Sequence, residues 1–199
     1  MHIRTPAILV AARAHAETAV VARLLTRDYG LVAGYVAGGR GRNLRPVVIP
    51  GNAVDLQLSA KSESQLPFAK LELITSRGPW LSEPLPAAAI SWTCALTASA
   101  LAERQAYPSL YNALGGLLDA ICHAPSARGW AGALVGYETL LLRELGFGGQ
   151  GARPEGDLPA ILAEMDRQRS AIEHYLLADR RGDVMAARQR LRQLLERMI

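Results

Sequence analysis

The sequence contains very little cysteine. Cys94 and Cys122 are the only two cysteines among 199 residues, and neither belongs to a CxxC pair. This argues against a disulfide framework and against a zinc ribbon, because both need cysteines at close, regular spacing. Both residues stand in apolar, helix-like stretches. We therefore predict buried thiols that pack as small hydrophobic side chains.

Long hydrophobic runs are also missing. No apolar run approaches the roughly 18 residues that a membrane-spanning helix needs. The short apolar stretch 7–12 is followed by Arg13 and His15, too early for a signal peptide, so we expect a cytoplasmic protein. Half of the residues are nevertheless hydrophobic and 20% are charged. This composition is typical of a globular chain with one large domain or two small ones.

Motifs of catalysis and metal binding are absent as well. The sequence has neither GxSxG nor GxxxxGK[ST], and its acidic residues are scattered. The letters GxGxxG at 146–151 follow a predicted helix, and Pro154 lies just beyond. We interpret them as a helix C-cap and connection rather than a phosphate cradle. No histidine stands at metal-ligand spacing: they are His2, His15, His123 and His174. The sequence therefore predicts no enzyme, no metal and no cofactor.

Positive charge is concentrated in the first part of the chain. Residues 1–77 carry ten basic and five acidic side chains, whereas the remainder carries 12 basic and 13 acidic ones. An excess of one sign in one region favours a polyanionic partner there. The alternative is an ordinary solvated basic surface.

The first 77 residues show the pattern of short strands. Residues 54–61 alternate strictly between apolar and polar side chains, which is the period of a half-buried strand. Further strands are predicted at 8–12, 18–26, 30–36 and 68–75. Five short strands with turns between them predict a small closed or nearly closed β-barrel over residues 1–78.

A basic, glycine-rich segment lies between the third and fourth predicted strands. It runs from Gly38 to Pro46 and includes Arg40, Arg42 and Arg45. A hydrophobic core has no use for these side chains, so we predict a mobile basic loop on the surface. The aromatic residues of the barrel are Tyr29, Tyr35 and Phe68. Because there are so few, nucleic acid would be held mainly by its backbone; the alternative is that Tyr35 and Phe68 belong to the core.

The remaining residues show a helical period. After a linker at 78–86, apolar side chains recur every three or four positions. They do so over residues 90–101, 110–121, 130–145, 158–176 and 184–198. This predicts a bundle of about five helices over residues 79–199, and an α+β fold for the chain. The arginines after residue 179 leave two interpretations open: a second contact to a polyanion, or a charged outer helix face.

The order of these segments resembles the RecO family of bacterial DNA repair and recombination proteins. The resemblance is carried by residues 17–26, residues 30–38, the basic loop to Arg45, and a Leu-rich helix with a Leu-Gly-aromatic end at 136–148. It implies an N-terminal OB-fold and a helical C-terminal domain. It also implies binding of single- and double-stranded DNA and annealing of complementary strands. The DNA-binding positions carried over are Arg13, Arg27, Arg40, Arg42, Arg45, Lys61 and Lys70.

The same resemblance implies protein partners. These are RecR, the C-terminal tail of single-stranded-DNA-binding protein, and RecA, which the family helps to load. An alternative function is therefore a protein-interaction adaptor that binds this tail, with incidental DNA affinity. Trp92, Tyr137 and Arg143 are the candidates for a peptide groove, although the two aromatic residues also suit a helix core. Many family members insert a four-cysteine zinc module where this chain has the cysteine-free stretch 149–158, so we predict no structural zinc.

Overall fold

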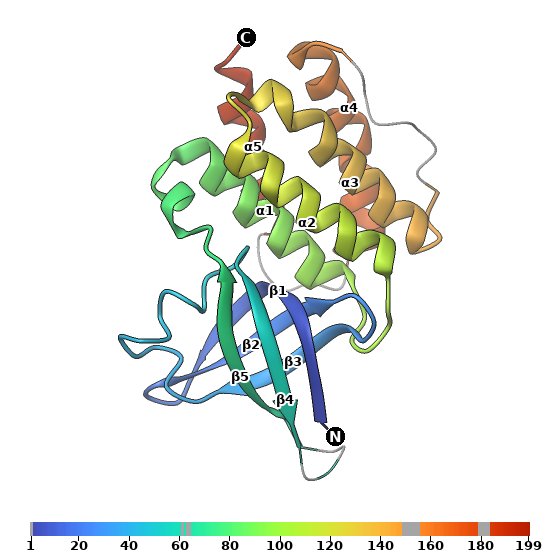
Figure 1. Ribbon diagram of the computed structural model, residues 1–199. Helices are drawn as coiled ribbons and strands as arrows, with labels where there is room; N and C mark the ends of the chain where they lie inside the picture. Colours follow the sequence, from blue (N-terminus) through green and yellow to red (C-terminus); the bar gives the residue numbers. More distant parts are fainter. Residues whose placement is uncertain (1, 61, 63–64, 149–155, 179–183) are drawn as a thin grey trace. The chain divides into compact units, whose positions relative to one another are not determined.

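The computed structural model describes residues 2–60, 62, 65–148, 156–178 and 184–199. The chain divides into two compact units (Figure 1). The first unit consists of Met1–Pro79 with Leu101–Tyr111, and the second of Trp80–Ala100 with Asn112–Ile199. None of the helices within the described ranges is long and apolar enough to cross a membrane.

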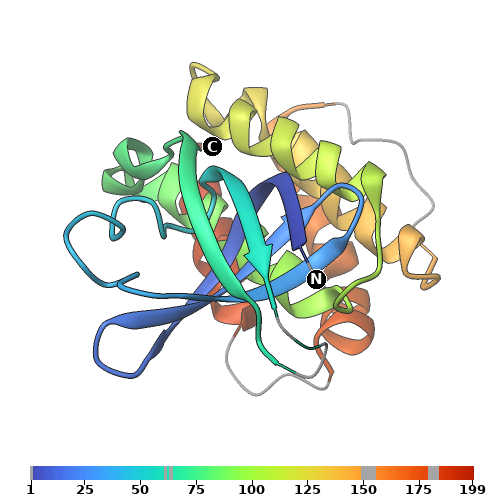
Figure 2. The same ribbon diagram turned by 60° about the horizontal axis from the view of Figure 1, so that its bottom comes forward.

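The first unit is a five-stranded barrel, which Figure 2 shows with the strands crossing one another obliquely. The strands close in the order β1-β2-β3-β5-β4. A closed barrel of five mostly antiparallel strands in this order is the architecture of an OB-fold. The expected barrel and the α+β class are therefore confirmed. The strands are β1 (His2–His15), β2 (Ala19–Thr26), β3 (Gly30–Val36), β4 (Ala53–Ser59) and β5 (Phe68–Thr75).

Strand β1 is much longer than the predicted strand at 8–12 because it pairs with two strands, β2 and β4. Residues 2–8 pair with β4, and residues 7–15 pair with β2. The register shifts between Leu9 and Ala11, and such a bulge bends a strand from one neighbour toward the next. The sequence pattern marked only the apolar middle of this strand.

The barrel core is formed by alternate residues of each strand, as the period of two requires. Gly34 lies inside, where β3 meets β5, and a Cβ atom there would stand 2.6 Å from the Cβ of Ala69. Glycine at this position therefore allows the barrel to close. The core residues are Ala7, Leu9, Val20, Ala22, Leu24, Val32, Val36, Val54, Leu56, Leu58, Ala69 and Leu71.

A segment distant in sequence, residues 101–111, belongs to the barrel unit. The backbone N–H of Arg104 donates to the carbonyl of Leu31 at 2.8 Å. Gly30 has a φ of +66°, and a Cβ atom there would lie 2.0 Å from the carbonyl oxygen of Gln105. Only glycine satisfies both requirements. These contacts are made by backbone atoms and so leave no trace in the hydrophobic pattern.

The second unit is helical, and the predicted periodicities are confirmed. Its first helix begins at Pro84, inside the stretch expected to be a linker, because proline is well suited to the first helical turn. A short 3₁₀ helix at Gly78–Ser82 precedes it. The α-helices among the described residues are α1 (Pro84–Ala100), α2 (Pro108–His123), α3 (Ala131–Glu144), α4 (Leu158–Ala171) and α5 (Val184–Glu196), with a π-helical turn at Ile172–Leu176.

The glycine-rich motif after α3 is a helix terminus. Gly146 has a φ of +82°, and its N–H donates to Arg143 while the N–H of Phe147 donates to Leu142. This is the hydrogen-bond pattern of a Schellman motif, so the C-cap interpretation is confirmed for residues 146–148. The rest of GxGxxG lies outside the described residues, as does most of the stretch 149–158, where no zinc module is expected. Cys94 and Cys122 are buried thiols, as predicted.

Candidate nucleic-acid interface

The segment between β3 and β4, residues 37–52, is called the arginine loop below. It extends away from the strands in Figures 1 and 2. Leu44, Val47 and Val48 pack against the barrel core. The Asn52 amide donates to the carbonyls of Pro46 and Val47, both at 3.0 Å. The segment is attached to the barrel through these apolar contacts and through the backbone N–H of Gly51, which donates to the carbonyl of Leu9 at 2.7 Å. That its arginine-bearing part is mobile stays a prediction.

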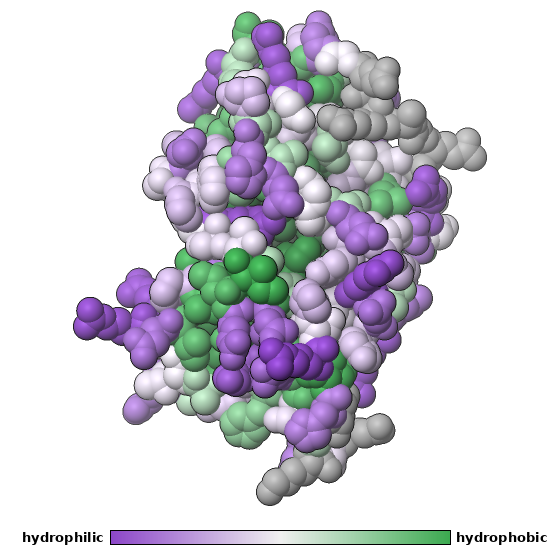
Figure 3. All heavy atoms as spheres, in the orientation of Figure 1, coloured by the Kyte–Doolittle hydropathy of each residue, from purple (hydrophilic) through white to green (hydrophobic). Residues whose placement is uncertain are grey.

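The three arginines of the loop point outward and share one hollow. Together with Pro46 and Ile49 they line a surface depression of about 530 Å³, and Figure 3 shows hydrophilic side chains projecting from this side of the barrel. The Arg40 guanidinium donates to the carbonyl of Glu17 at 3.1 Å. Among the described residues, no carboxylate forms an ion pair with Arg40, Arg42 or Arg45. Their charges thus remain available to phosphate groups.

Three ring side chains, His15, Tyr35 and Phe68, form what we call the outer aromatic row. The Tyr35 ring lies edge-on to His15 at 5.8 Å and to Phe68 at 5.2 Å between centroids. Phe68 is 60% exposed and Tyr35 is partly buried, so neither belongs to the barrel core. An exposed row of rings on an OB-fold is a surface on which nucleobases can stack.

The register places Arg13 in line with the outer aromatic row. Arg13 pairs with Val21, Val21 with Tyr35, and Tyr35 with Phe68, so their side chains share the outer face of the sheet. The turn after β1 joins this row to the arginine loop, since the backbone N–H of Arg40 donates to the carbonyl of Thr18 at 2.9 Å. Four of the predicted DNA-binding arginines therefore surround one surface.

The other predicted DNA-binding residues lie apart from this surface or are paired. Lys70 is exposed on β5 but forms an ion pair with Glu72 at 3.0 Å. Arg27 stands in the turn between β2 and β3, at the end of the barrel remote from Tyr35. Lys61 lies outside the described residues. We accordingly centre the candidate interface on the arginine loop and the outer aromatic row.

The sequence analysis did not include His15 in the site, and it left a core position open for Phe68. The alternation of side chains along each strand could have placed both rings on the outer face. His15 is two residues from Arg13 on β1, and Phe68 is two residues from Lys70 on β5. Residues two apart on a strand face the same side, so each ring shares the face of an exposed cation.

In the helical unit, two of the three peptide-groove candidates are core residues. Trp92 is fully buried, and its Nε1 donates to the Glu138 carboxylate at 2.8 Å. Tyr137 is buried as well, and its hydroxyl lies 2.6 Å from the hydroxyl of Thr97. Neither side chain reaches the surface, which corrects their assignment to a groove. Arg143 is exposed at the end of α3.

The buried hydroxyl of Tyr137 leads to a pH-dependence prediction. Burial raises the pKa of Tyr137 well above its ordinary value of 10.0, and the hydrogen bond with Thr97 opposes only part of this rise. The folded state therefore holds the proton more tightly, so this group's stabilisation is intact below about pH 10 and is lost as the pH rises further. Urea denaturation of Tyr137→Phe and the parent chain should give stability curves that converge above about pH 10. A constant difference at higher pH would contradict the prediction.

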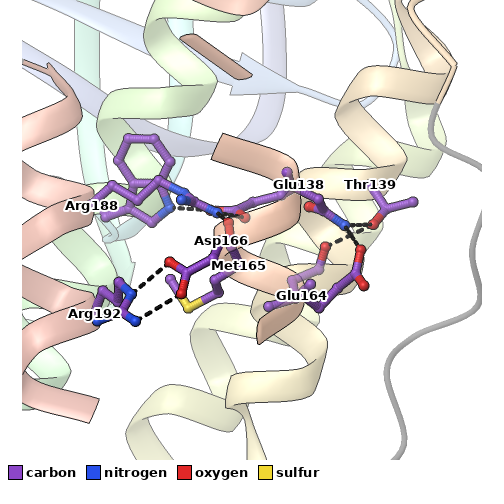
Figure 4. A network of polar contacts seen from close by, with 10 residues as sticks. Glu138, Thr139, Glu164, Met165, Asp166, Arg188 and Arg192 are labelled. Atoms are coloured by element: carbon purple, nitrogen blue, oxygen red, sulfur yellow. Dashed lines mark hydrogen bonds and ion pairs between the residues drawn. The ribbon is translucent and has the colours of Figure 1, made fainter. Parts of the chain in front are cut away.

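Two central arginines of the last helix, Arg188 and Arg192, form ion pairs inside the helical unit. These pairs favour a structural role for both side chains over contact with a polyanion. Arg188 is buried and forms an ion pair with Glu138 at 2.7 Å. Arg192 donates two hydrogen bonds to Asp166, both at 2.7 Å, and these hydrogen bonds lower the pKa of Asp166. Figure 4 shows both arginines of α5 with their partners, Glu138 of α3 and Asp166 of α4.

Comparison with known proteins finds the same family over both units. Two family models match: "Recombination protein O N terminal" over residues 1–77 and "Recombination protein O C terminal" over residues 82–151. A DNA repair protein RecO of Rhodospirillum centenum is 44% identical over 144 residues, which cover 71% of this chain and 56% of that protein. The corresponding protein of Ruegeria sp. is 39% identical over 149 residues, 74% of this chain and 61% of its own length. The chain thus spans about three-fifths of the length of these relatives.

Proposed function

Because this chain belongs to the RecO family of DNA repair and recombination proteins, we propose that it is a recombination mediator. It binds single- and double-stranded DNA, promotes annealing of complementary strands, and acts with RecR in loading RecA. It does so without catalysing a chemical step.

The observation that carries this proposal is the position of the outer aromatic row beside the arginine loop. Bases of a single strand stack on Phe68 and Tyr35, while Arg13 and the loop arginines neutralise the phosphates on either side. Stacking and charge neutralisation do not depend on base identity. The interface accordingly binds strands of any sequence, as a general repair factor requires.

Annealing follows from the same arrangement without nucleotide hydrolysis. Base pairing supplies the free energy, and the barrier to overcome is the repulsion between two polyanionic strands. The arginines lower that repulsion. Because Phe68 is exposed rather than enclosed, a stacked base can leave the protein when a complementary base arrives.

The proposal includes contact with the C-terminal tail of single-stranded-DNA-binding protein, as the family resemblance implies. An adaptor that binds this tail with incidental DNA affinity is the alternative function. With Trp92 and Tyr137 buried, the tail would need another apolar surface of the helical unit. Separate titrations of labelled DNA and labelled tail peptide distinguish the two functions.

The proposal is tested by the salt dependence of DNA binding. Replacing Arg40, Arg42 and Arg45 together by alanine should reduce the log–log salt slope for single-stranded DNA by about 2, since each phosphate contact contributes about 0.7. Fluorescence anisotropy across a salt series measures the slope.

The matched control replaces three exposed arginines of the helical unit by alanine: Arg128, Arg143 and Arg169. This variant should keep the parent slope. A slope that falls in the control and not in the loop variant would move the binding site away from the barrel.

A further inference from the structure

The barrel unit contains a second feature that the proposed interface does not use, a cavity of about 410 Å³ at one end of β3. We call it the β3-edge cavity. Its lining comes from the barrel strands, from the segment before β5 and from residues 103–104. The side chains that bear on its chemistry are Asp28, Tyr29, Leu66, Pro67, Glu103 and Arg104.

The cavity exists because β3 lacks a continuous partner on this edge. Within the residues that the structure describes, β3 pairs with β5 at Tyr35–Phe68 alone, where the N–H of Tyr35 donates to the carbonyl of Pro67 at 2.7 Å. At the other end, Leu31 accepts a hydrogen bond from Arg104. Ala33 lies between these two residues, and peptide groups two apart on a strand point the same way. The N–H and C=O of Ala33 therefore face the cavity, and no strand of the described part of the chain pairs with them there.

We infer that the β3-edge cavity accepts one unstacked nucleobase of the bound strand. A flat base offers a donor next to an acceptor on its Watson–Crick edge, which matches the N–H and C=O of Ala33. The ring of Tyr29, which is 45% exposed, supplies a face for stacking, and Leu66 and Pro67 supply apolar walls. A cavity of about 150 Å³ is already large enough for benzene, so one base fits.

The charges at the rim favour a base over the other occupants. Asp28 and Glu103 bring negative charge to the rim, which Arg104 of the lining and the ion pair of Glu103 with Arg23 at 3.4 Å largely balance. The rim therefore offers no excess of cations to a phosphate, whereas its carboxylates can accept hydrogen bonds from the N–H groups of bases. An extended peptide strand is disfavoured, because the backbone contacts at Leu31 and Tyr35 close the free edge at both ends. Since every base carries a donor beside an acceptor, this site remains tolerant of sequence.

The cavity adjoins the outer aromatic row through the hydrogen bond between Tyr35 and Pro67. A strand that stacks on Phe68 and Tyr35 can therefore place a neighbouring base in the cavity. This inference rests on the proposed function, and it adds an anchor that holds one nucleotide in register while the adjacent bases remain free to pair.

The test uses the full chain and a fluorescein-labelled oligothymidylate. Tyr29→Ala removes the stacking face, and Ala33→Ile fills the cavity; each should weaken binding roughly tenfold. Tyr175→Ala, which removes a tyrosine of similar exposure (49%) from the helical unit, should leave binding unchanged. Circular dichroism confirms that the variants fold. Because Tyr29 is exposed at a turn, its variant remains informative if Ala33→Ile fails to fold.

A series of oligothymidylates, each with one abasic site at a different position, locates the anchored base. With the parent chain, the abasic site should reduce affinity most at one position of the series. With Ala33→Ile, the affinity should no longer depend on the position of the abasic site. If the parent chain does not bind oligothymidylate, the proposed function fails. If it binds, and Phe68→Ala weakens it while Tyr29→Ala and Ala33→Ile do not, the cavity inference alone is overturned. Oligolysine is the probe for a basic peptide. If Tyr29→Ala abolished oligolysine binding and left DNA affinity intact, the cavity inference would be overturned in favour of a basic peptide.

Discussion

Glu138→Ala is expected to lower the free energy of unfolding by about 3–5 kcal/mol. The Glu138 carboxylate is completely buried and accepts hydrogen bonds from Nε1 of Trp92 at 2.8 Å and from Nε and Nη2 of Arg188 at 2.9 and 2.7 Å. Removing it leaves the buried Arg188 guanidinium without a counter-charge, and that desolvated charge is the source of the loss. Urea denaturation followed by circular dichroism measures the change.

The control for this prediction is Asp166→Ala. Asp166 forms a comparable two-bond pair with Arg192, but it is half exposed, so its loss should cost at most about 1 kcal/mol. The double variant Glu138→Leu with Arg188→Met should recover most of the loss, since a buried ion pair can be replaced by apolar side chains at little cost. A Glu138→Ala variant no less stable than Asp166→Ala would contradict the argument.

The ion pair of Glu138 with Arg188 joins the part of the helical unit that the family model matches to the part beyond that match. Glu138 lies in the segment 136–148 that carries the family resemblance, and the matching family model ends at residue 151. Arg188 lies on α5, beyond that match, and is buried against α3 and α4 through Glu138 and the carbonyl of Met165. The C-terminal helix is therefore an integral part of the helical core.

Much of the barrel could be predicted from the sequence because its strands are amphipathic. The alternation at 54–61 and the apolar runs near 20, 30 and 70 located four strands within a residue or two. Alternating apolar residues mark the buried face of a strand, so this pattern locates strands whose inner face packs in the core. The long ends of β1 are less apolar, so the same method missed them.

The site was less predictable because it depends on pairing between distant residues. Tyr35 and Phe68 are both aromatic, and the sequence alone favours a core position for such side chains. Only the single parallel pairing between β3 and β5 reveals that they stand together on the outer face. Arg188 is a similar case, because the sequence alone predicts a surface cation at this position. Its buried partner, Glu138, lies 50 residues earlier in the chain.

Removing the rings of the outer aromatic row is expected to give the largest loss of DNA binding. Phe68→Ala should weaken binding of single-stranded DNA by about 1–3 kcal/mol, and combining it with Tyr35→Leu should lower affinity roughly 100-fold, because base–aromatic stacking contributes about 1–3 kcal/mol for each base. Leucine at position 35 preserves packing at this partly buried site. Since Phe68 is 60% exposed, its replacement should hardly affect stability. Fluorescence anisotropy with a labelled oligonucleotide measures the affinity.

The salt slope separates this effect from that of the arginine loop. Stacking releases no counterions, so the Tyr35→Leu/Phe68→Ala variant should lose affinity at every salt concentration with its slope unchanged, whereas the loop variant should lose slope. Phe147→Ala removes a phenylalanine of intermediate exposure (44%) from the helical unit and should bind as the parent does. If the aromatic variant instead kept full affinity at high salt, the bases would not rest on this face, and the arginines alone would hold the strand by its phosphates.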